Sequence, residues 1–155
     1  MQTVIDCAAY IYNRYKEVYG AEIDEMKLHK LLYFVQRESI IQTGAPMFSA
    51  TFWGWKYGPV IKEIRGLYKE GVFNQMQVYI NDPNDQHILD FAFDLYSSKD
   101  TWSLSRLTHG EISWINSRIG ISEDAAGSNP ISIDDIYRDA NRVKERRALL
   151  AHENH

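Results

Sequence analysis

Five histidines are the side chains of this sequence best suited to acid–base or metal chemistry. They stand at positions 29, 87, 109, 152 and 155, and none of them has the spacing of a zinc motif such as H-E-x-x-H. His109 and Glu111 lie close enough in the sequence to suggest acid–base catalysis. We instead expect His109 to cap or hydrogen-bond the end of a helix, and we predict no metal site.

Nucleophilic side chains are present but lack the surroundings that would activate them. Ser103, Ser105 and Thr108 have no G-x-S-x-G turn around them. Cys7 stands in an apolar stretch without a neighbouring His, which favours a buried and inert thiol. No glycine-rich phosphate loop occurs either. We therefore predict that the protein is not an enzyme, has no catalytic residues and uses no cofactor.

Aromatic side chains are the best candidates for binding. The chain has 10 Tyr and 4 Trp residues, whose rings serve either a packed core or an interface. Trp55 and Tyr57 precede Gly58, which permits a tight turn, and the simpler interpretation is that both rings pack a strand against a helix. The alternative, which the sequence leaves open, is that either ring anchors a partner protein.

Basic side chains form two groups. In the second expected helix, Lys27, Lys30 and Arg37 lie off the apolar stripe and are predicted to face solvent, a partner or a neighbouring carboxylate. The simpler interpretation is that these basic side chains form a solvated face of the helix. The alternative is that Lys30 and Tyr33 frame a recognition surface.

The last expected helix carries the second basic group: Arg138, Arg142, Lys144, Arg146 and Arg147. Basic residues near a helix C-terminus complement the helix dipole, which is the favoured explanation. The competing one is contact with nucleic acid or with an acidic protein surface. A formal net charge of -4 argues against broad attachment to nucleic acid or to anionic membranes.

Capping signals and apolar periodicity divide the chain into helices. Helices are expected from Thr3 to Gly20, Asp24 to Gly44, Pro59 to Gly71, Asn81 to Tyr96, Ser103 to Leu107, Glu111 to Ile119 and from Ser132 onward. Residues 47–57 and 72–80 alternate apolar and polar side chains, so each is predicted as a short strand, and the two are expected to pair. Residues 120–130 are the expected loop.

The composition is that of one ordinary globular domain, with 155 residues, 45% hydrophobic and 25% charged. We expect a mainly α, compact single-domain helical bundle with at most a small two-stranded β element. The domain is predicted to span residues 1–150, followed by a frayed tail over residues 151–155. No apolar run of membrane-spanning length and no signal peptide is seen, so a cytoplasmic protein without membrane contact is expected.

Three segments carry more specific signals than the helix pattern: Met26 to Tyr33, Phe52 to Val60, and Leu107 to Trp114. Together they resemble the Panacea domain family of SocA-like antitoxins and phage-associated GepA-like proteins. The most specific part is the Trp-x-Tyr-Gly-Pro-Val sequence at Trp55 to Val60. The resemblance runs from about Met1 into the last helix and covers nearly the whole chain.

The resemblance implies a helical protein that neutralises a cognate protein toxin, by direct binding or by delivering the toxin to a protease. The expected partners are therefore the toxin and, in the second case, a protease. Partner-binding residues are expected in two places: Lys30 and Tyr33 on the helix, and Trp53, Trp55, Lys56 and Tyr57 in the aromatic segment. The alternative is a prophage accessory protein that acts on nucleic acid or host machinery. The sequence leaves the oligomeric state open.

Overall fold

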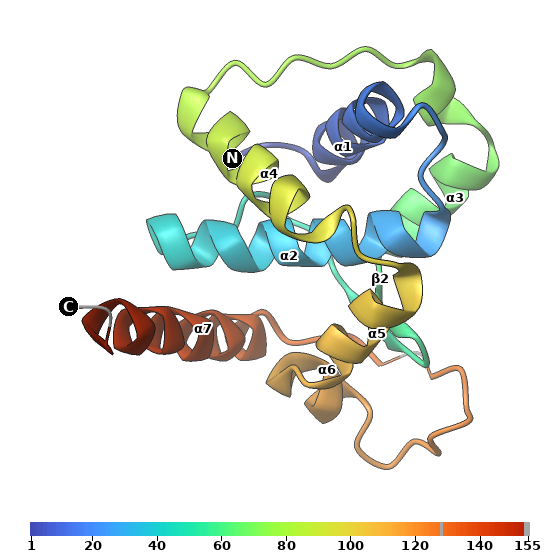
Figure 1. Ribbon diagram of the computed structural model, residues 1–155. Helices are drawn as coiled ribbons and strands as arrows, with labels where there is room; N and C mark the ends of the chain where they lie inside the picture. Colours follow the sequence, from blue (N-terminus) through green and yellow to red (C-terminus); the bar gives the residue numbers. More distant parts are fainter. Residues whose placement is uncertain (128, 154–155) are drawn as a thin grey trace.

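Helix α2 (Glu25–Thr43) runs through the centre of the molecule, with α1 and α4 on one side of it and α7 on the other (Figure 1). The computed structural model describes residues 1–127 and 129–153. Within them the elements are α1 (Val4–Tyr19), α2, β1 (Trp53–Trp55), β2 (Gly58–Val60), α3 (Lys62–Lys69), the 3-10 helix η1 (Val72–Gln75), α4 (Pro83–Tyr96), α5 (Thr101–His109), α6 (Ile112–Ser117) and α7 (Ile133–Glu153). This confirms the mainly α fold with a small two-stranded β element.

The helix ends follow the capping signals of the sequence. The Thr3 side chain accepts from the Asp6 backbone N–H at 3.1 Å, and the Asp24 side chain accepts from that of Lys27 at 2.9 Å. Gly20 ends α1 and Gly44 ends α2, each in the left-handed conformation that glycine adopts without strain. The first two helices therefore begin and end where the sequence predicts.

The core gathers around α2, which is buried from Lys27 to Ile40. Apolar side chains of α1, α3, α4, α5 and α7 pack against it. Because every face of the helix is covered, its polar side chains are buried together with its apolar ones. The interpretation of Lys27, Lys30 and Arg37 as a solvated face is wrong, since their exposed fractions are 7%, 0% and 6%. Arg37 instead faces a carboxylate, which the sequence prediction also allowed, and that carboxylate belongs to Glu111.

The β element is a tight hairpin in which β1 pairs antiparallel with β2, and Trp53 lies opposite Val60. The sequence prediction of a helix beginning at Pro59 is wrong, because Gly58 and Pro59 belong to the second strand and α3 begins at Lys62. Proline suits the first turn of a helix, but it is equally compatible with an edge strand. The outer side of β1 is bridged to Pro130, and Gly54 of β1 donates to the Asn129 carbonyl, so β2, which contains Pro59, is the edge strand of the hairpin.

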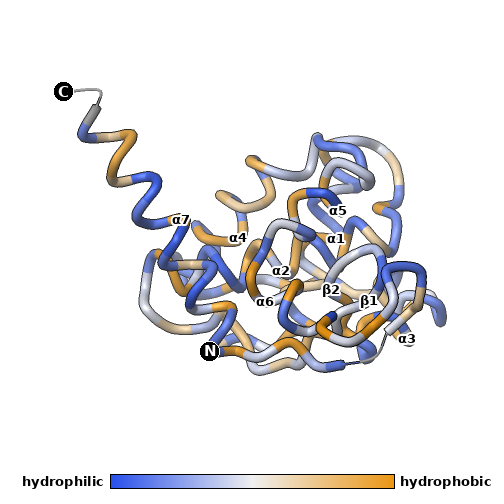
Figure 2. The backbone as a smooth tube through the Cα atoms, turned by 90° about the horizontal axis from the view of Figure 1, so that it is seen from below, coloured by the Kyte–Doolittle hydropathy of each residue, from blue (hydrophilic) through white to orange (hydrophobic). Residues whose placement is uncertain are grey.

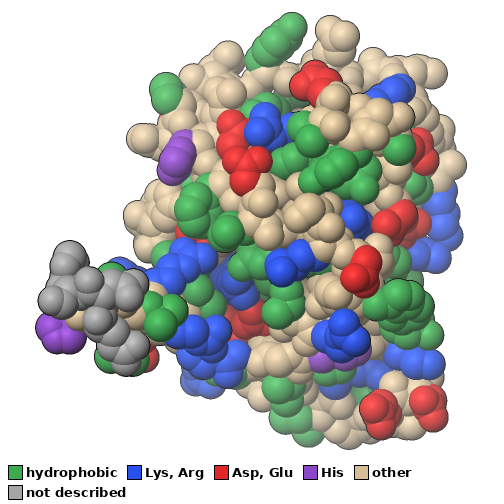
Figure 3. Space-filling model, viewed as in Figure 1, with side chains coloured by type: hydrophobic (Ala, Val, Ile, Leu, Met, Phe, Trp, Pro, Cys, Tyr) green, Lys and Arg blue, Asp and Glu red, His purple; other side chains and the backbone are tan. Residues whose placement is uncertain are grey.

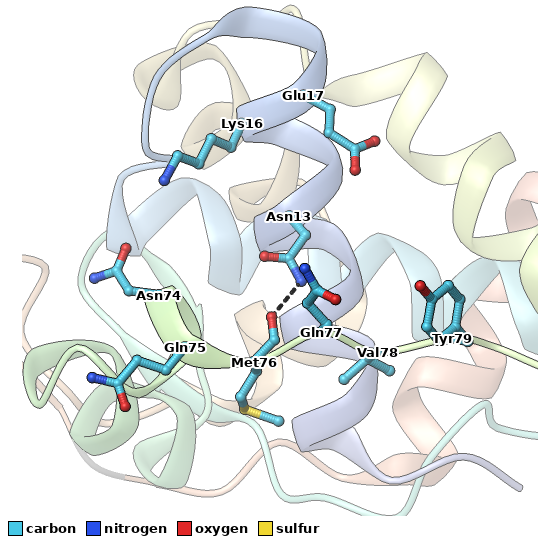
Figure 4. A pocket seen from close by; sticks show the side chains of 9 residues that line it. All are labelled: Asn13, Lys16, Glu17, Asn74, Gln75, Met76, Gln77, Val78 and Tyr79. Carbon is cyan, nitrogen blue, oxygen red and sulfur yellow. Dashed lines mark hydrogen bonds between the residues drawn. The ribbon is translucent and has the colours of Figure 1, made fainter.

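Residues 72–80 do not form the predicted strand partner. They consist of η1 followed by an extended segment that lies across α1, and the Asn13 side chain donates to the Met76 carbonyl at 2.8 Å. Met76 and Val78 pack on the core whereas Gln77 and Tyr79 are exposed, which explains the alternating pattern without a sheet. A shallow polar groove of about 850 Å³ lies between this segment and α1 (Figure 4).

The second half of the chain agrees with the prediction except at α5. Asp100, not Ser103, caps α5, because its side chain accepts from the Ser103 backbone N–H at 2.9 Å. Asp82 caps α4, with Pro83 in the first turn as expected. Helix α7 continues through Glu153, past the expected domain end at residue 150, and its end projects from the body (Figure 2). Residues 154–155 of the expected tail lie outside the described residues.

No helix of the described chain is long and apolar enough to cross a membrane.

Candidate functional site

The turn of the hairpin sits directly on α2 and α5, at a point where the backbone approaches two side chains. Gly58 has a φ of +120°, and a Cβ atom there would lie 2.6 Å from Lys30 Cε and 2.7 Å from Thr108 Oγ1. Only glycine fits both the backbone conformation and the space. The three segments that carry the sequence signals therefore meet at one point, below the turn formed by Lys56 and Tyr57.

Lys30 is the buried centre of this junction. Its side chain has no exposed area, and its ammonium group lies 3.5 Å from the Pro59 carbonyl and 3.8 Å from Met26 Sδ. No carboxylate of the described chain lies within ion-pair distance of it. Burial lowers the pKa of Lys30 from 10.5 to about 7, and the more distant Asp24 and Glu25 offset this only in part.

Trp114 fixes the hairpin from the other side. Its indole Nε1 donates to the Trp55 carbonyl at 2.8 Å. The His109 ring stacks on the Trp114 ring, with centroids 4.1 Å apart and planes 14° apart. His109 is the last residue of α5, so it lies at a helix end as predicted, and burial lowers its pKa. The backbone of the turn is thus held by contacts from α2, α5 and α6.

Above this base lies an exposed aromatic pair. Tyr57 and Trp102 are 43% and 65% exposed, and their rings meet edge to face with centroids 5.4 Å apart. Two hollows adjoin at Met26 and Tyr57, one of about 380 Å³ that is also lined by Trp55 and one of about 350 Å³ that is also lined by Trp102. We call Met26, Trp55, Tyr57 and Trp102 the aromatic surface.

Charged groups of both signs surround the aromatic surface. The Arg65 guanidinium lies 4.9 Å from the Trp55 ring centroid, and the Lys56 ammonium lies 5.2 Å from that of Tyr57. Asp24 and Asp124 line the two hollows. An apolar centre with a mixed polar rim is the usual composition of a protein-binding patch.

The predicted binding residues divide into two groups in the structure. Trp55, Lys56 and Tyr57 line the hollows, whereas Trp53 faces elsewhere, half-buried beneath the Lys62 ammonium at 3.6 Å. Lys30 and Tyr33 have no exposed area. Their part in partner binding stays a prediction. Because both side chains are buried, they could affect a partner only through the residues that cover them.

Tyr33 belongs to a separate buried network. Its hydroxyl donates to Asp139 Oδ2 at 2.8 Å and lies 2.7 Å from Ser113 Oγ. Asp139 also accepts from the backbone N–H groups of Ile112 and Ser113, at 2.6 and 3.0 Å. Burial raises the pKa of Tyr33 well above its ordinary value, so the ring acts as a neutral hydrogen-bonding group that ties α2 to α6 and α7.

Met26 and Trp102 are members of the aromatic surface that the sequence interpretation missed. Trp102 is in the first turn of α5, where an exposed aromatic residue has no packing role. The sequence contained this signal, because Trp102 does not share the helix face of Leu104 and Thr108, which are the buried positions of α5. The sequence could not predict the contact of Trp102 with Tyr57, since this contact depends on how α5 packs against the hairpin.

In the described part of the chain, no group of three or more His, Cys, Asp and Glu side chains is arranged to hold a metal ion.

Comparison with known proteins gives one match. Residues 28–115 match the family described as "Antitoxin SocA-like, Panacea domain". The matched range contains Lys30, the hairpin and Thr108, which are the parts that form the base of the aromatic surface. No curated protein and no solved structure matches the chain. An antitoxin-like family suggests a non-enzymatic role and, in general, a toxin as partner. With more than half of its length matched, the chain belongs to the family of SocA-like antitoxins with a Panacea domain.

Proposed function

We propose that this protein is an antitoxin that neutralises a cognate protein toxin by binding it through the aromatic surface. The observation that carries the proposal is the exposed edge-to-face pair of Tyr57 and Trp102 between two adjoining hollows, on a base built from the family's matched segments. Tyr and Trp are the residues most enriched among interface anchors.

The rigidity of the base supports this use of the surface. The backbone at Gly58 packs closely against the side chains of Lys30 and Thr108. The Trp114 indole donates a hydrogen bond to the Trp55 carbonyl. A partner that docks on a preorganised surface loses less conformational entropy than one that must order a loop. The hollows on either side of Tyr57 are each large enough to take a bulky side chain of the partner, such as Leu or Phe.

Direct binding is the first step of either route to neutralisation. In one route the bound antitoxin blocks the toxin, and in the other it delivers the toxin to a protease. The proposal is that the aromatic surface makes the toxin contact in both. A cytoplasmic location and the absence of catalysis stay predictions.

The experiment pairs the gene product encoded next to this one with wild-type protein, Tyr57→Ala, Trp102→Ala and the control Tyr79→Ala. Tyr79 is 83% exposed and lies across α1, away from the aromatic surface, so it controls for the loss of an exposed ring. The readouts are growth rescue, the dissociation constant of the purified pair and the melting temperature of each variant.

We expect Tyr57→Ala and Trp102→Ala each to weaken binding by about 30-fold or more, the effect of losing a hot-spot residue. Their melting temperatures should stay near the wild-type value, and Tyr79→Ala should rescue growth fully. Rescue by both site variants with unchanged affinity would contradict the assignment of the surface. A harmless neighbour that never binds would contradict the antitoxin function itself.

A further inference from the structure

A second hollow, of about 430 Å³, opens where α2, α5 and α7 meet and is distinct from the aromatic surface. Five arginines line it: Arg37, Arg106, Arg142, Arg146 and Arg147. Apolar and aromatic side chains, among them Phe34, Tyr96, Leu107 and Val143, form the rest of its wall. Lys and Arg side chains gather along α7 on this face of the molecule (Figure 3). We call this hollow the arginine cavity.

Carboxylates neutralise only part of this charge. Arg37 forms an ion pair with Glu111, and Arg147 binds both carboxylate oxygens of Glu38, at 2.8 and 3.0 Å. Arg142 lies 3.8 Å from the same Glu111, which is already occupied by Arg37.

Arg106 and Arg146 have no ion-pair partner among the residues that the structure describes. Two carboxylates thus face five guanidinium groups, in a protein whose formal net charge is -4. The cavity is therefore a strongly positive site on an acidic protein.

The dipole of α7 does not explain this arrangement. Arg37 comes from α2, and Arg106 lies in the last turn of α5, where the dipole of that helix favours a cation. Arg142, Arg146 and Arg147 lie 11, 7 and 6 residues before Glu153, the last residue of α7. The dipole acts within the last turn of a helix, which is about 3.6 residues. The arginines instead share one property, which is that they converge on the cavity from three elements.

The base of the cavity is rigid and partly aromatic. The Phe34 and Tyr96 rings stack with centroids 4.0 Å apart and planes 13° apart. The Arg37 guanidinium lies 4.8 Å from the Phe34 centroid and donates to the Tyr96 hydroxyl at 2.7 Å. Arg37 is therefore held in place, whereas Arg106 and Arg146 are exposed at the rim and free to close on a ligand.

We propose that the arginine cavity binds a small ligand that carries two or more phosphate groups, such as a nucleoside polyphosphate. The planar guanidinium group matches phosphate oxygens in a two-point contact, which makes arginine the preferred residue for phosphate recognition. A volume of about 430 Å³ falls in the range of small-molecule sites. Leu107 and Val143 supply an apolar wall for the part of the ligand that carries no charge.

The test is isothermal titration of the full chain with ATP and with inorganic pyrophosphate, in the absence of Mg²⁺, with adenosine as the uncharged control. The site variant is Arg106→Gln together with Arg146→Gln. The matched control is Lys99→Gln together with Lys144→Gln, which removes the same charge from exposed positions that neither line the cavity nor form an ion pair with a described residue.

ATP and pyrophosphate should bind to the wild type and to the control variant with equal affinity, and adenosine should not bind. The site variant should bind both anions at least about tenfold more weakly, because it loses two charge-assisted contacts. Its melting temperature without ligand should equal that of the wild type, since neither arginine has an ion pair to lose.

Three results would overturn the proposal. The first is that neither anion binds the wild type at millimolar concentration. The second is an equal loss of affinity in the site and control variants, which would reveal a general effect of net charge. The third is binding of a hexaglutamate peptide or of duplex DNA in place of both anions, which would make the cavity a macromolecular contact. None of these results bears on toxin binding by the aromatic surface.

Discussion

The hydroxyl of Tyr33 donates to the carboxylate of Asp139, 106 residues further along the chain, at a distance of 2.8 Å. Tyr33 lies inside the matched family range and Asp139 lies outside it. Both side chains have no exposed area, so the bond joins the central helix to α7 inside one core. We infer that α7 packs into the same core as the matched residues, and the domain bounds expected at residues 1 and 150 stay a prediction.

Removing the Asp139 carboxylate should therefore destabilise the whole fold. Asp139→Ala removes the acceptor of the backbone N–H groups of Ile112 and Ser113, and it leaves the Tyr33 hydroxyl with Ser113 Oγ as its remaining partner. We expect the free energy of unfolding to fall by roughly 2 to 4 kcal/mol, because each buried unsatisfied group costs about 1 to 3 kcal/mol. Urea denaturation measures this, with the exposed Asp134→Ala as the control. A change below about 0.5 kcal/mol would show that α7 contributes little to the core.

The buried Lys30 should make the protein more stable as the pH rises above 7. Its pKa falls from 10.5 to about 7 on burial, so between these values the unfolded chain binds more protons than the folded protein. The free energy of unfolding then increases with pH, by about 2 kcal/mol between pH 7 and 9. Above pH 9 the gain is opposed, because burial raises the pKa of Cys7 from 9.0 to about 12 and that of Tyr68 also rises.

Lys30→Met isolates this effect, since methionine keeps most of the side-chain length and carries no charge. The stability of the variant should no longer rise between pH 7 and 9, as measured by urea denaturation at several pH values, and it should fall slightly, because burial raises the pKa of Glu111 to about 7 and that of Cys7 to about 12. Burial of His29 and His109 lowers the pKa of each, so these groups titrate below the window. A wild-type protein whose stability does not rise between pH 7 and 9 would mean that Lys30 is not desolvated as the structure shows.

The helices of this fold could be predicted because their ends are local. Thr3, Asp24 and Asp82 each cap a helix through a contact two or three residues away. The hairpin could not be predicted with the same certainty, because Pro59 suits both a helix start and an edge strand. The choice between them depends on how Gly58 packs against Lys30 and Thr108, which are distant in the sequence.

The residues of the candidate site also divide into those that the sequence could predict and those that it could not. Trp55 and Tyr57 stand out in the sequence because they adjoin the Gly-Pro pair, and both line the aromatic surface. Lys30 resembled a surface residue because it lies off the apolar stripe of α2. The apolar stripe of α2 did not predict which of its side chains are exposed, because this central helix is covered on every face.

Gly58 should be the position in the hairpin least tolerant of change. Gly58→Ala places a Cβ atom against Lys30 and Thr108 and forces alanine into a conformation with a φ of +120°. We expect a loss of at least about 3 kcal/mol in the free energy of unfolding, from backbone strain and overpacking together. Gly66→Ala in α3 is the control, because nothing lies within 4 Å of its Cβ position. It should stabilise the protein by about 0.5 to 1 kcal/mol, so a Gly58→Ala variant as stable as Gly66→Ala would contradict the packing described for the turn.

The Tyr57 and Trp102 rings should be coupled in the free protein, before any partner binds. An edge-to-face pair contributes about 0.5 to 1.5 kcal/mol, and the exposure of this pair favours the lower end of that range. A double-mutant cycle with Tyr57→Ala, Trp102→Ala and the double variant, followed by urea denaturation, measures the coupling. A coupling near 0.5 kcal/mol would mean that the aromatic surface is already in place before a partner binds. A coupling of zero would mean that the rings move independently and that the partner must order them, which predicts weaker binding than a preformed site gives.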